Sequence, residues 1–131
     1  MAINLRDIEV FKPYPNELPD ALLEAEGLDE DATSKWFDAE TQRIAKIGAE
    51  VLGAYAMDHI DEVNFELHGV VVAHNVRKQG LGRWLVGHAI GVAESKGGRH
   101  LHTHTMGGSR IFQKLGFSRQ TDGLIFDMIQ E

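Results

Sequence analysis

The sequence predicts a mixed α/β fold, and three observations support that prediction. Runs with the alternation of strands are interspersed with a run of helical period, and the second half reads strand, loop, helix, strand, helix, strand. The length of 131 residues suits one hydrophobic core and is too short for two. Hydrophobic residues at 43% and charged residues at 25% are ordinary for a globular chain. We therefore expect one domain over residues 1–131.

The first third of the chain predicts one strand and two short helices. Residues Ile3–Phe11 alternate loosely between apolar and polar, as a first strand does. A helix is expected over Leu18–Glu26, ended by Gly27. A second short helix is expected over Asp29–Ala39.

The next segment predicts a hairpin and a third strand. Arg43–Ile47 and Val51–Met57 are apolar-rich runs joined by a short turn over residues 48–50. Asn64–Ala73 follows as the third strand, and its part Val70–Val72 is continuously apolar. Such a run is typical of a strand that is covered on both faces.

The clearest helix of the chain begins near Leu81. Its hydrophobic residues recur at helical period, and the pair of glycines at 97–98 ends it. A strand over His100–Thr105, a short helix over Ser109–Leu115 and a last strand over Leu124–Ile129 complete the pattern.

Charge and composition restrict the partners of the protein. The net charge of −7 argues against a nucleic-acid or anionic-membrane partner, and no run is long and apolar enough for a membrane span. The absence of cysteine excludes disulfides, thiolate nucleophiles and cysteine-ligated metals. Without a signal-peptide pattern, the cytoplasm is the expected location. A homodimer could form if Leu124–Ile129 pairs at a sheet edge.

The segment Val70–Arg83 carries the strongest functional signal. It leads from a buried strand through Gly80 and Gly82 into a helix, whose first backbone N–H groups and dipole favour a phosphate. Its positive charges come from Arg77, Lys78 and Arg83. The third glycine of a dinucleotide fingerprint is absent, because position 85 is leucine, and so is the Gly-Lys-Ser/Thr of a P-loop. A turn whose glycines only relieve strain remains the alternative.

Two motifs in this half resemble a known family. Arg77-x-x-Gly80-x-Gly82, behind the Val70–Val72 strand, resembles the acetyl-CoA loop of the GNAT acetyltransferase superfamily. Phe112-Gln-Lys-Leu-Gly-Phe117 is similar to the Tyr-x-x-x-Gly-Phe element of that superfamily. The resemblance extends over residues 64–117 and is only topological before them.

The resemblance implies a strongly twisted mixed sheet, flanked by helices, whose central fourth and fifth strands are splayed. Acetyl-CoA, the acyl donor, would enter the splay and pass its acetyl group directly to an amine of a small molecule or peptide, without a metal. Backbone groups matching Val70, Val71 and Val72 would pair with pantetheine. The pyrophosphate would take N–H groups matching Lys78, Gln79, Gly80, Leu81, Gly82 and Arg83.

The reaction needs a base, because a lysine-like amine with a pKa of about 10.4 is protonated at pH 7. Glu66 and His68 lie on one face of the predicted strand that leads to the loop, since side chains alternate. By resemblance, Glu66 matches the general base of histone-acetyltransferase-like members and His68 a catalytic histidine of arylalkylamine-type members. A solvated glutamate and a hydrogen-bonded strand histidine are the alternatives.

The tyrosine that protonates the leaving thiolate in many members of the superfamily is replaced here by Phe112. Water, His102 or His104 could serve instead, and Phe112 could pack against pantetheine. The replacement also keeps open a second hypothesis, in which the protein is a non-catalytic acyl-CoA-binding regulator that docks on a partner protein.

Two further clusters have simple explanations. His100, His102 and His104 share a strand face, but neighbouring positions of that kind are about 6.5–7 Å apart, so a polar strand face is favoured over a metal site. Acidic residues also gather before the third strand, where a solvated turn is favoured over attraction of a cationic substrate. They are Asp58, Asp61 and Glu62.

Overall fold

A mixed sheet of seven strands runs through the residues that the computed structural model describes, which are 2–28, 30–104, 109–120 and 123–128. The strands are β1 (Glu9–Phe11), β2 (Thr41–Ile47), β3 (Glu50–His59), β4 (Asn64–Val72), β5 (His100–Thr103), β6 (Ser118–Gln120) and β7 (Gly123–Asp127). Their order in the sheet is β1-β2-β3-β4-β5-β7-β6. Strands β4 and β5 pair in parallel, whereas the other neighbours are antiparallel.

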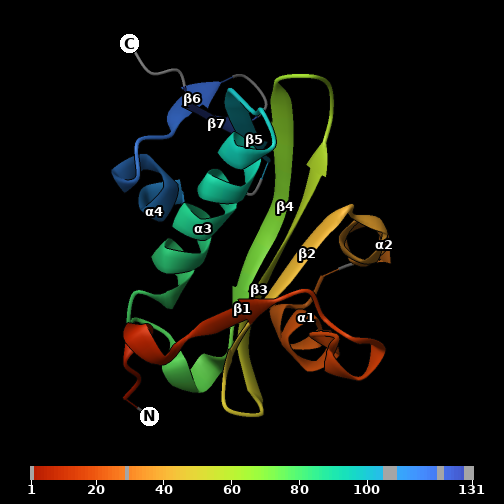
Figure 1. Ribbon diagram of the computed structural model, residues 1–131, viewed down its shortest axis with the longest axis vertical. Coiled ribbons are helices and arrows are strands. Elements are labelled where there is room, and N and C mark those ends of the chain that lie inside the picture. Colours follow the sequence, from red (N-terminus) through yellow and green to blue (C-terminus); the bar gives the residue numbers. More distant parts are fainter. Residues whose placement is uncertain (1, 29, 105–108, 121–122, 129–131) are drawn as a thin grey trace.

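Helices cover both faces of this sheet (Figure 1). They are α1 (Asp20–Glu26), α2 (Glu30–Asp38), α3 (Leu81–Ser95) and α4 (Ser109–Lys114). Three short 3-10 turns, Leu5–Asp7, Pro15–Glu17 and His74–Val76, join the elements. The long helix α3 packs on one face, and α1 and α2 pack on the other. No helix among the described residues is both long and apolar enough to cross a membrane.

Two hydrophobic cores follow from this layering. Under α3, the buried side chains of Leu81, Leu85 and Ala89 meet Phe65 and Leu67 of β4. The second core lies under α1 and α2. Its buried members are Leu23, Trp36, Ala39, Ile44, Ala54, Ala56 and Val71. The continuous apolar run of β4 is therefore covered on both faces, as its sequence predicts.

The polar contact inside the larger core fixes α3 against β3. Tyr55 is fully buried, and its hydroxyl lies 2.8 Å from Nδ1 of His88 on α3. Desolvation raises the pKa of Tyr55 to about 12, and burial lowers the pKa of His88. Both groups are therefore uncharged at neutral pH, which suits the apolar interface.

A β-bulge in β4 decides which side chains face which core. Ala56 of β3 pairs with Gly69 and Met57 pairs with Leu67, so that His68 is an extra residue in the β4 ladder. Without the bulge, strict alternation would reverse the faces of the following residues. Gly69 then leaves room for the indole of Trp36, which a Cβ would approach to 3.2 Å.

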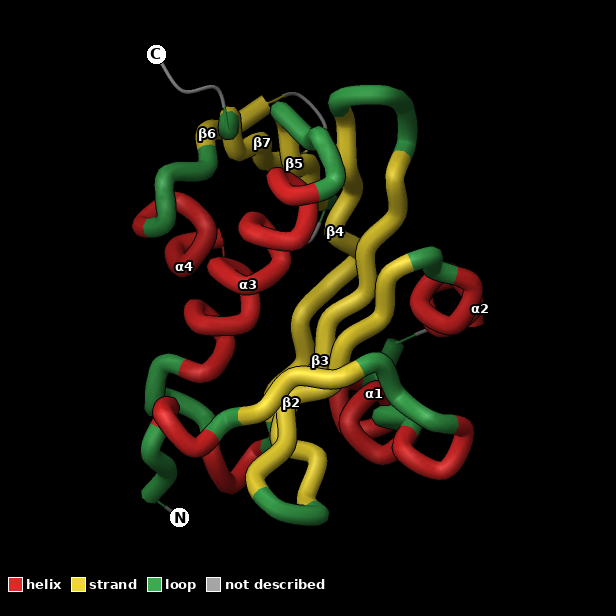
Figure 2. Tube along the Cα trace, viewed as in Figure 1, coloured by secondary structure: helices red, strands yellow, loops and turns green. Residues whose placement is uncertain are grey.

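Beyond the bulge, β4 separates from β5. The parallel pairing runs from Asn64, opposite His100, to Leu67, opposite Thr103. Residues 68–72 continue β4, and on the β5 side they pair with none of the residues that the structure describes. Figure 2 shows β2, β3 and β4 curving together while β5 and β7 gather behind α3. The two central strands thus diverge as the resemblance implies.

The structure corrects three expectations from the sequence. The first strand begins only at Glu9, because Leu5–Asp7 forms a 3-10 turn. Ser118–Gln120 forms the unexpected strand β6, which pairs with β7. Since β7 lies between β5 and β6, it is not the sheet edge at which Leu124–Ile129 was expected to pair between subunits, and a homodimer stays a prediction. The expected ends Asp29, Thr105 and Ile129 lie outside the described residues.

Candidate active site

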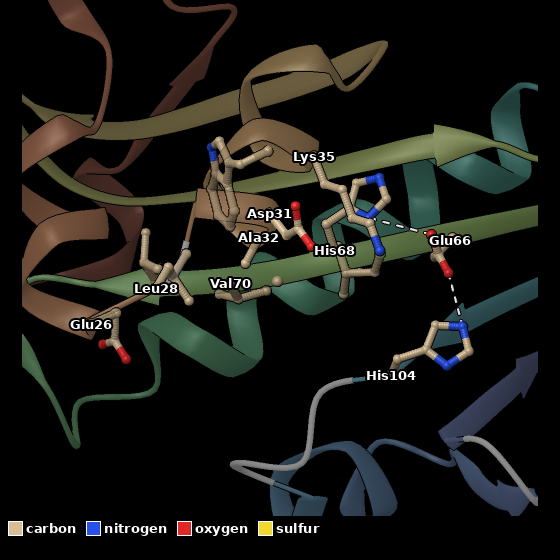
Figure 3. A pocket seen from close by; sticks show the side chains of 13 residues that line it. Glu26, Leu28, Asp31, Ala32, Lys35, Glu66, His68, Val70 and His104 are labelled. Carbon is tan, nitrogen blue, oxygen red and sulfur yellow. Dashed lines mark ion pairs between the residues drawn. The ribbon is translucent and has the colours of Figure 1, made fainter.

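A cleft of about 420 Å³ runs along the free edge of β4, between that strand and helices α1 and α2. At one end it is lined by Glu26 and Leu28, and at the other by Glu66, His68 and His104. Figure 3 shows Glu66 between the two histidines, with Val70 and Leu28 farther along the cleft. Polar groups therefore gather at the end where β4 and β5 separate.

Four side chains form a continuous polar chain at that end. Oε1 of Glu66 lies 2.8 Å from Nε2 of His104, and Oε2 of Glu66 lies 3.3 Å from Nδ1 of His68. Nε2 of His68 is in turn 2.7 Å from Oδ2 of Asp58. Glu66 and His68 share one face of the strand, so this geometric prediction is confirmed.

Asp58 is the member of this chain that the sequence analysis missed. It was expected in a solvated turn, but β3 extends to His59 and places Asp58 directly opposite Glu66. Its Oδ1 accepts a hydrogen bond of 2.8 Å from the backbone N–H of Glu40, which fixes the carboxylate. The bulge at His68 shifts the register so that Asp58 shares the face of Glu66 and His68, and no pattern within a single run of the sequence signals that shift.

The side chains of this polar chain differ in their exposure to solvent. The side chain of His68 is 11% exposed and that of Glu66 is 24% exposed, whereas the ring of His104 is 58% exposed. Each of the three contacts joins an imidazole nitrogen to a carboxylate oxygen. Glu66 therefore lies within reach of a histidine ring on either side.

The loop before α3 has the backbone of an anion site. Lys78 has a φ of +65° and Gly80 a φ of +88°. Backbone of left-handed conformation next to right-handed residues can turn neighbouring N–H groups toward one side, where they bind an anion. A lysine in the left-handed region is strained, and strain of this kind concentrates at functional sites. The N-cap residue of α3 is Gly80, which carries no side chain that could cap the helix. A phosphate site at this loop stays a prediction.

The other predicted residues of the loop have defined places. Arg83 and Lys78 are exposed, whereas Leu81 is buried in the core, so only its backbone is available. The side-chain oxygen of Gln79 accepts a hydrogen bond of 2.8 Å from the backbone N–H of Ile3, which ties the N-terminal segment to the loop. A Cβ on Gly82 would lie 3.8 Å from Cγ2 of Val72, so the helix start lies against the β4 edge.

Arg77 is held by two groups. Its Nη2 forms an ion pair with Oε1 of Glu26, the last residue of α1, and its Nε donates to the carbonyl of Val72 at 3.3 Å. Because Glu26 also lines the cleft, this pair connects the loop to the wall formed by α1.

Phe112 is not among the described residues that line the cleft. Its ring is 5% exposed and packs edge-on against Phe117, with 5.1 Å between the ring centroids. The contact with pantetheine stays a prediction that this position does not favour.

The three histidines of β5 and its end have three different partners. Nδ1 of His100 is 2.7 Å from Asp127, and Nε2 of His102 is 2.8 Å from Oδ1 of Asn64. Of the three, only His104 lines the cleft.

Comparison with solved structures supports the fold. An IAA acetyltransferase from Bacillus cereus ATCC 14579 is 21% identical, with a TM-score of 0.76 over 87% of this chain and 79% of the other. A GNAT family acetyltransferase from Elizabethkingia anophelis with acetyl-CoA bound is 24% identical, with a TM-score of 0.71 over 87% and 78%. A Bacillus subtilis acetyltransferase in complex with CoA is 21% identical, with a TM-score of 0.75 over 93% and 98%.

The sequence itself identifies the family. No curated protein matches the chain significantly. The model of the acetyltransferase (GNAT) family, however, matches residues 5–117, which include the cleft, the loop before α3 and the Phe112–Phe117 element. This chain therefore belongs to the GNAT family of acetyltransferases.

Proposed function

We propose that this acetyltransferase moves an acetyl group from acetyl-CoA to the primary amine of a small molecule or peptide by direct transfer. The observation that carries the proposal is the cleft itself, which joins the free edge of β4 to the Glu66–His68 pair. Solved relatives of the same fold bind acetyl-CoA or CoA, which supports the choice of donor.

The donor would bind through the backbone. Backbone groups of Val70, Val71 and Val72 lie on the part of β4 that β5 leaves unpaired, and they suit the amides of pantetheine. The N–H groups from Lys78 to Arg83 suit the pyrophosphate, since they open a helix and include two residues of positive φ. The exposed cationic side chains of this segment would add positive charge for the phosphates, in a chain whose net charge is −7.

The amine would meet its base at the other end of the cleft. Removing its proton at pH 7 costs about 4–5 kcal/mol for an amine of pKa about 10.4. Glu66 accepts that proton in the proposal, and His68, held by Asp58, shares it. The attacking nitrogen then displaces the thiolate without a covalent intermediate on the enzyme. Asp31 of α2 also lines the cleft and would favour a cationic acceptor.

A thiol-release assay tests this function. Acetyl-CoA would be incubated with a panel that contains spermidine, tryptamine, glutamate and a lysine-containing peptide, and free CoA would be measured. We expect release above the hydrolytic background with at least one amine and the acetylated amine as product. Tight CoA binding without turnover of any amine would instead favour the regulator that docks on a partner protein.

The ion pair between Arg77 and Glu26 gives a second prediction. Glu26→Gln should strengthen CoA binding by up to about five-fold, because it removes the competitor for Arg77 and exposed pairs are worth about 0.2–1 kcal/mol. Isothermal titration with CoA measures the change.

The control for this prediction is Glu24→Gln, an equal change of charge on the same helix at a residue outside the described ion pairs. An equal gain in both variants would mean that only the overall charge matters. A loss of affinity in Glu26→Gln would show that Arg77 does not serve the phosphates.

A further inference from the structure

One ammonium group, that of Lys35 on α2, belongs to the described residues that line the cleft. The carboxylates along the same cleft are those of Glu26, Asp31 and Glu66. A cleft that served only cationic amines would gain nothing from a lysine, because the two positive charges repel each other. The proposed function therefore leaves Lys35 without a role.

The charged groups of the cleft differ in what they are paired with. Glu26 forms an ion pair with Arg77, and Glu66 contacts two histidines. Lys35 and Asp31 form no ion pair with any residue that the structure describes. They are four positions apart on one helix, a spacing at which opposite charges often pair. The ammonium of Lys35 thus lines the cleft without a carboxylate from the described part of the chain.

The packing of the next residue fixes where Lys35 stands along the cleft. The side chain of Trp36 is buried, and a Cβ on Gly69 would approach its indole to 3.2 Å. Gly69 directly follows His68 in β4. Lys35 therefore stands at the end of the cleft that carries His68, and not at the loop before α3. In Figure 3, Lys35 projects from α2 toward His68.

We propose that Lys35 binds a carboxylate of the acceptor, and that the acceptor is a free amino acid rather than an amine without an acidic group. This inference rests on the proposed function and names the substrate class of the same cleft. The amine of such a molecule would meet Glu66 on β4, while its carboxylate would meet the ammonium of Lys35 on α2. Contacts at both ends of one small zwitterion would orient the amine for attack.

The distribution of charge distinguishes this class of acceptor from others. A polyamine would bring a second cation against Lys35, and an arylalkylamine would offer it no partner. The side chain of a lysine within a peptide has no carboxylate close to its amine. A free amino acid carries both signs of charge, so the carboxylates and the lysine of the cleft attract it together.

Matched substrates test the role of Lys35. Leucine, glutamate and lysine would each be compared with its α-carboxamide in the thiol-release assay, for the wild type and for Lys35→Met. For the amino acid that reacts fastest, we expect the variant to lose about tenfold in kcat/KM, a low value for a hydrogen bond between charged groups, because Lys35 is exposed. Its carboxamide should change less than about twofold. Both proteins meet the same two amines, so the difference between the pKa values of those amines cancels.

Three further variants separate charge at this point from charge in general. Lys35→Arg keeps the cation and should keep the preference for the free amino acid, whereas Lys35→Glu should reverse that preference. Lys12→Met is the matched control, since it removes the same charge at an exposed residue that does not line the cleft, and both rates should stay at wild-type values. Equal losses with amino acid and carboxamide in Lys35→Met would overturn the inference. Wild-type turnover confined to amines without a carboxylate would overturn it too, while the proposed function would stand.

Isothermal titration gives a readout that needs no turnover. With CoA bound, the wild type should bind the free amino acid about tenfold more tightly than Lys35→Met does, and CoA alone should bind both proteins equally. Weaker binding of CoA to Lys35→Met would overturn the inference, because the lysine would then serve the donor. If the wild type turns over no amine, the proposed function fails. In that case equal affinity of the wild type for amino acid and carboxamide would still overturn the role of Lys35, and a preference that Lys35→Met abolishes would support it.

Discussion

Replacement of Gly82 by tryptophan should abolish CoA binding. Gly82 lies in the first turn of α3, beside Val72 at the free edge of β4, and so between the proposed pantetheine and pyrophosphate sites. An indole at this point would cover the N–H groups that open the helix. Hydrogen bonds to charged groups contribute about 1.5–3 kcal/mol each, so the loss of two corresponds to an affinity lower by roughly 10²–10⁴-fold.

Gly82→Ala is the matched control. Its Cβ would lie 3.8 Å from Val72, which is an ordinary contact, and alanine favours a helix over glycine by about 1 kcal/mol. We expect this variant to bind CoA nearly as the wild type does in isothermal titration. Thermal melts of both variants would show whether the fold is intact. If a folded Gly82→Trp protein binds CoA with wild-type affinity, the phosphate does not lie at this loop.

The elements that the sequence predicts best are those whose pattern is local. The hairpin of β2 and β3 and the long helix α3 follow from alternation and helical period within one run. Strand β6 could not be predicted in this way, because all three of its residues, Ser118–Gln120, are exposed and polar or charged, so no apolar face reveals it.

In the candidate site, too, the features that depend on one run of sequence could be predicted, whereas those that depend on strand pairing could not. Glu66 and His68 could be paired from their spacing in one strand, and Gly80 and Gly82 from the loop motif. The contact of Asp58 with His68 joins residues ten positions apart and depends on how two strands pair. The bulge at His68 and the positive φ of Lys78 also depend on neighbours that a single run does not contain.

Glu66→Gln should lower kcat for acetyl transfer by about 10²–10⁴-fold, with little change in the KM for acetyl-CoA. The amide keeps the shape of the side chain but cannot accept the proton of the amine. The two contacts of Glu66, to His68 and His104, lie at the cleft end away from the loop, so donor binding should persist. Steady-state kinetics with the fastest amine of the panel and varied acetyl-CoA measures both constants.

The pH dependence gives a sharper readout of the same variant. Without a base, only amine that is already uncharged can react, and its fraction rises about tenfold per pH unit below a pKa of about 10.4. The rate of the Glu66→Gln variant should therefore keep rising with pH up to the pKa of the amine, about 10.4. The wild-type rate should reach its plateau at a lower pH. Parallel profiles for the two proteins would show that Glu66 is not the base.

The double variant Glu66→Gln/His68→Gln decides whether the two residues act as one unit. Their side chains are in contact at 3.3 Å, and Asp58 holds the far nitrogen of His68, so either substitution breaks the same chain. Groups that act together lose most of their contribution when the first is removed, and the double variant should then be barely slower than Glu66→Gln alone. If the loss of kcat in the double variant equals the product of the losses in the two single variants, Glu66 and His68 act independently. In that case one of the two residues accepts the proton of the amine without help from the other.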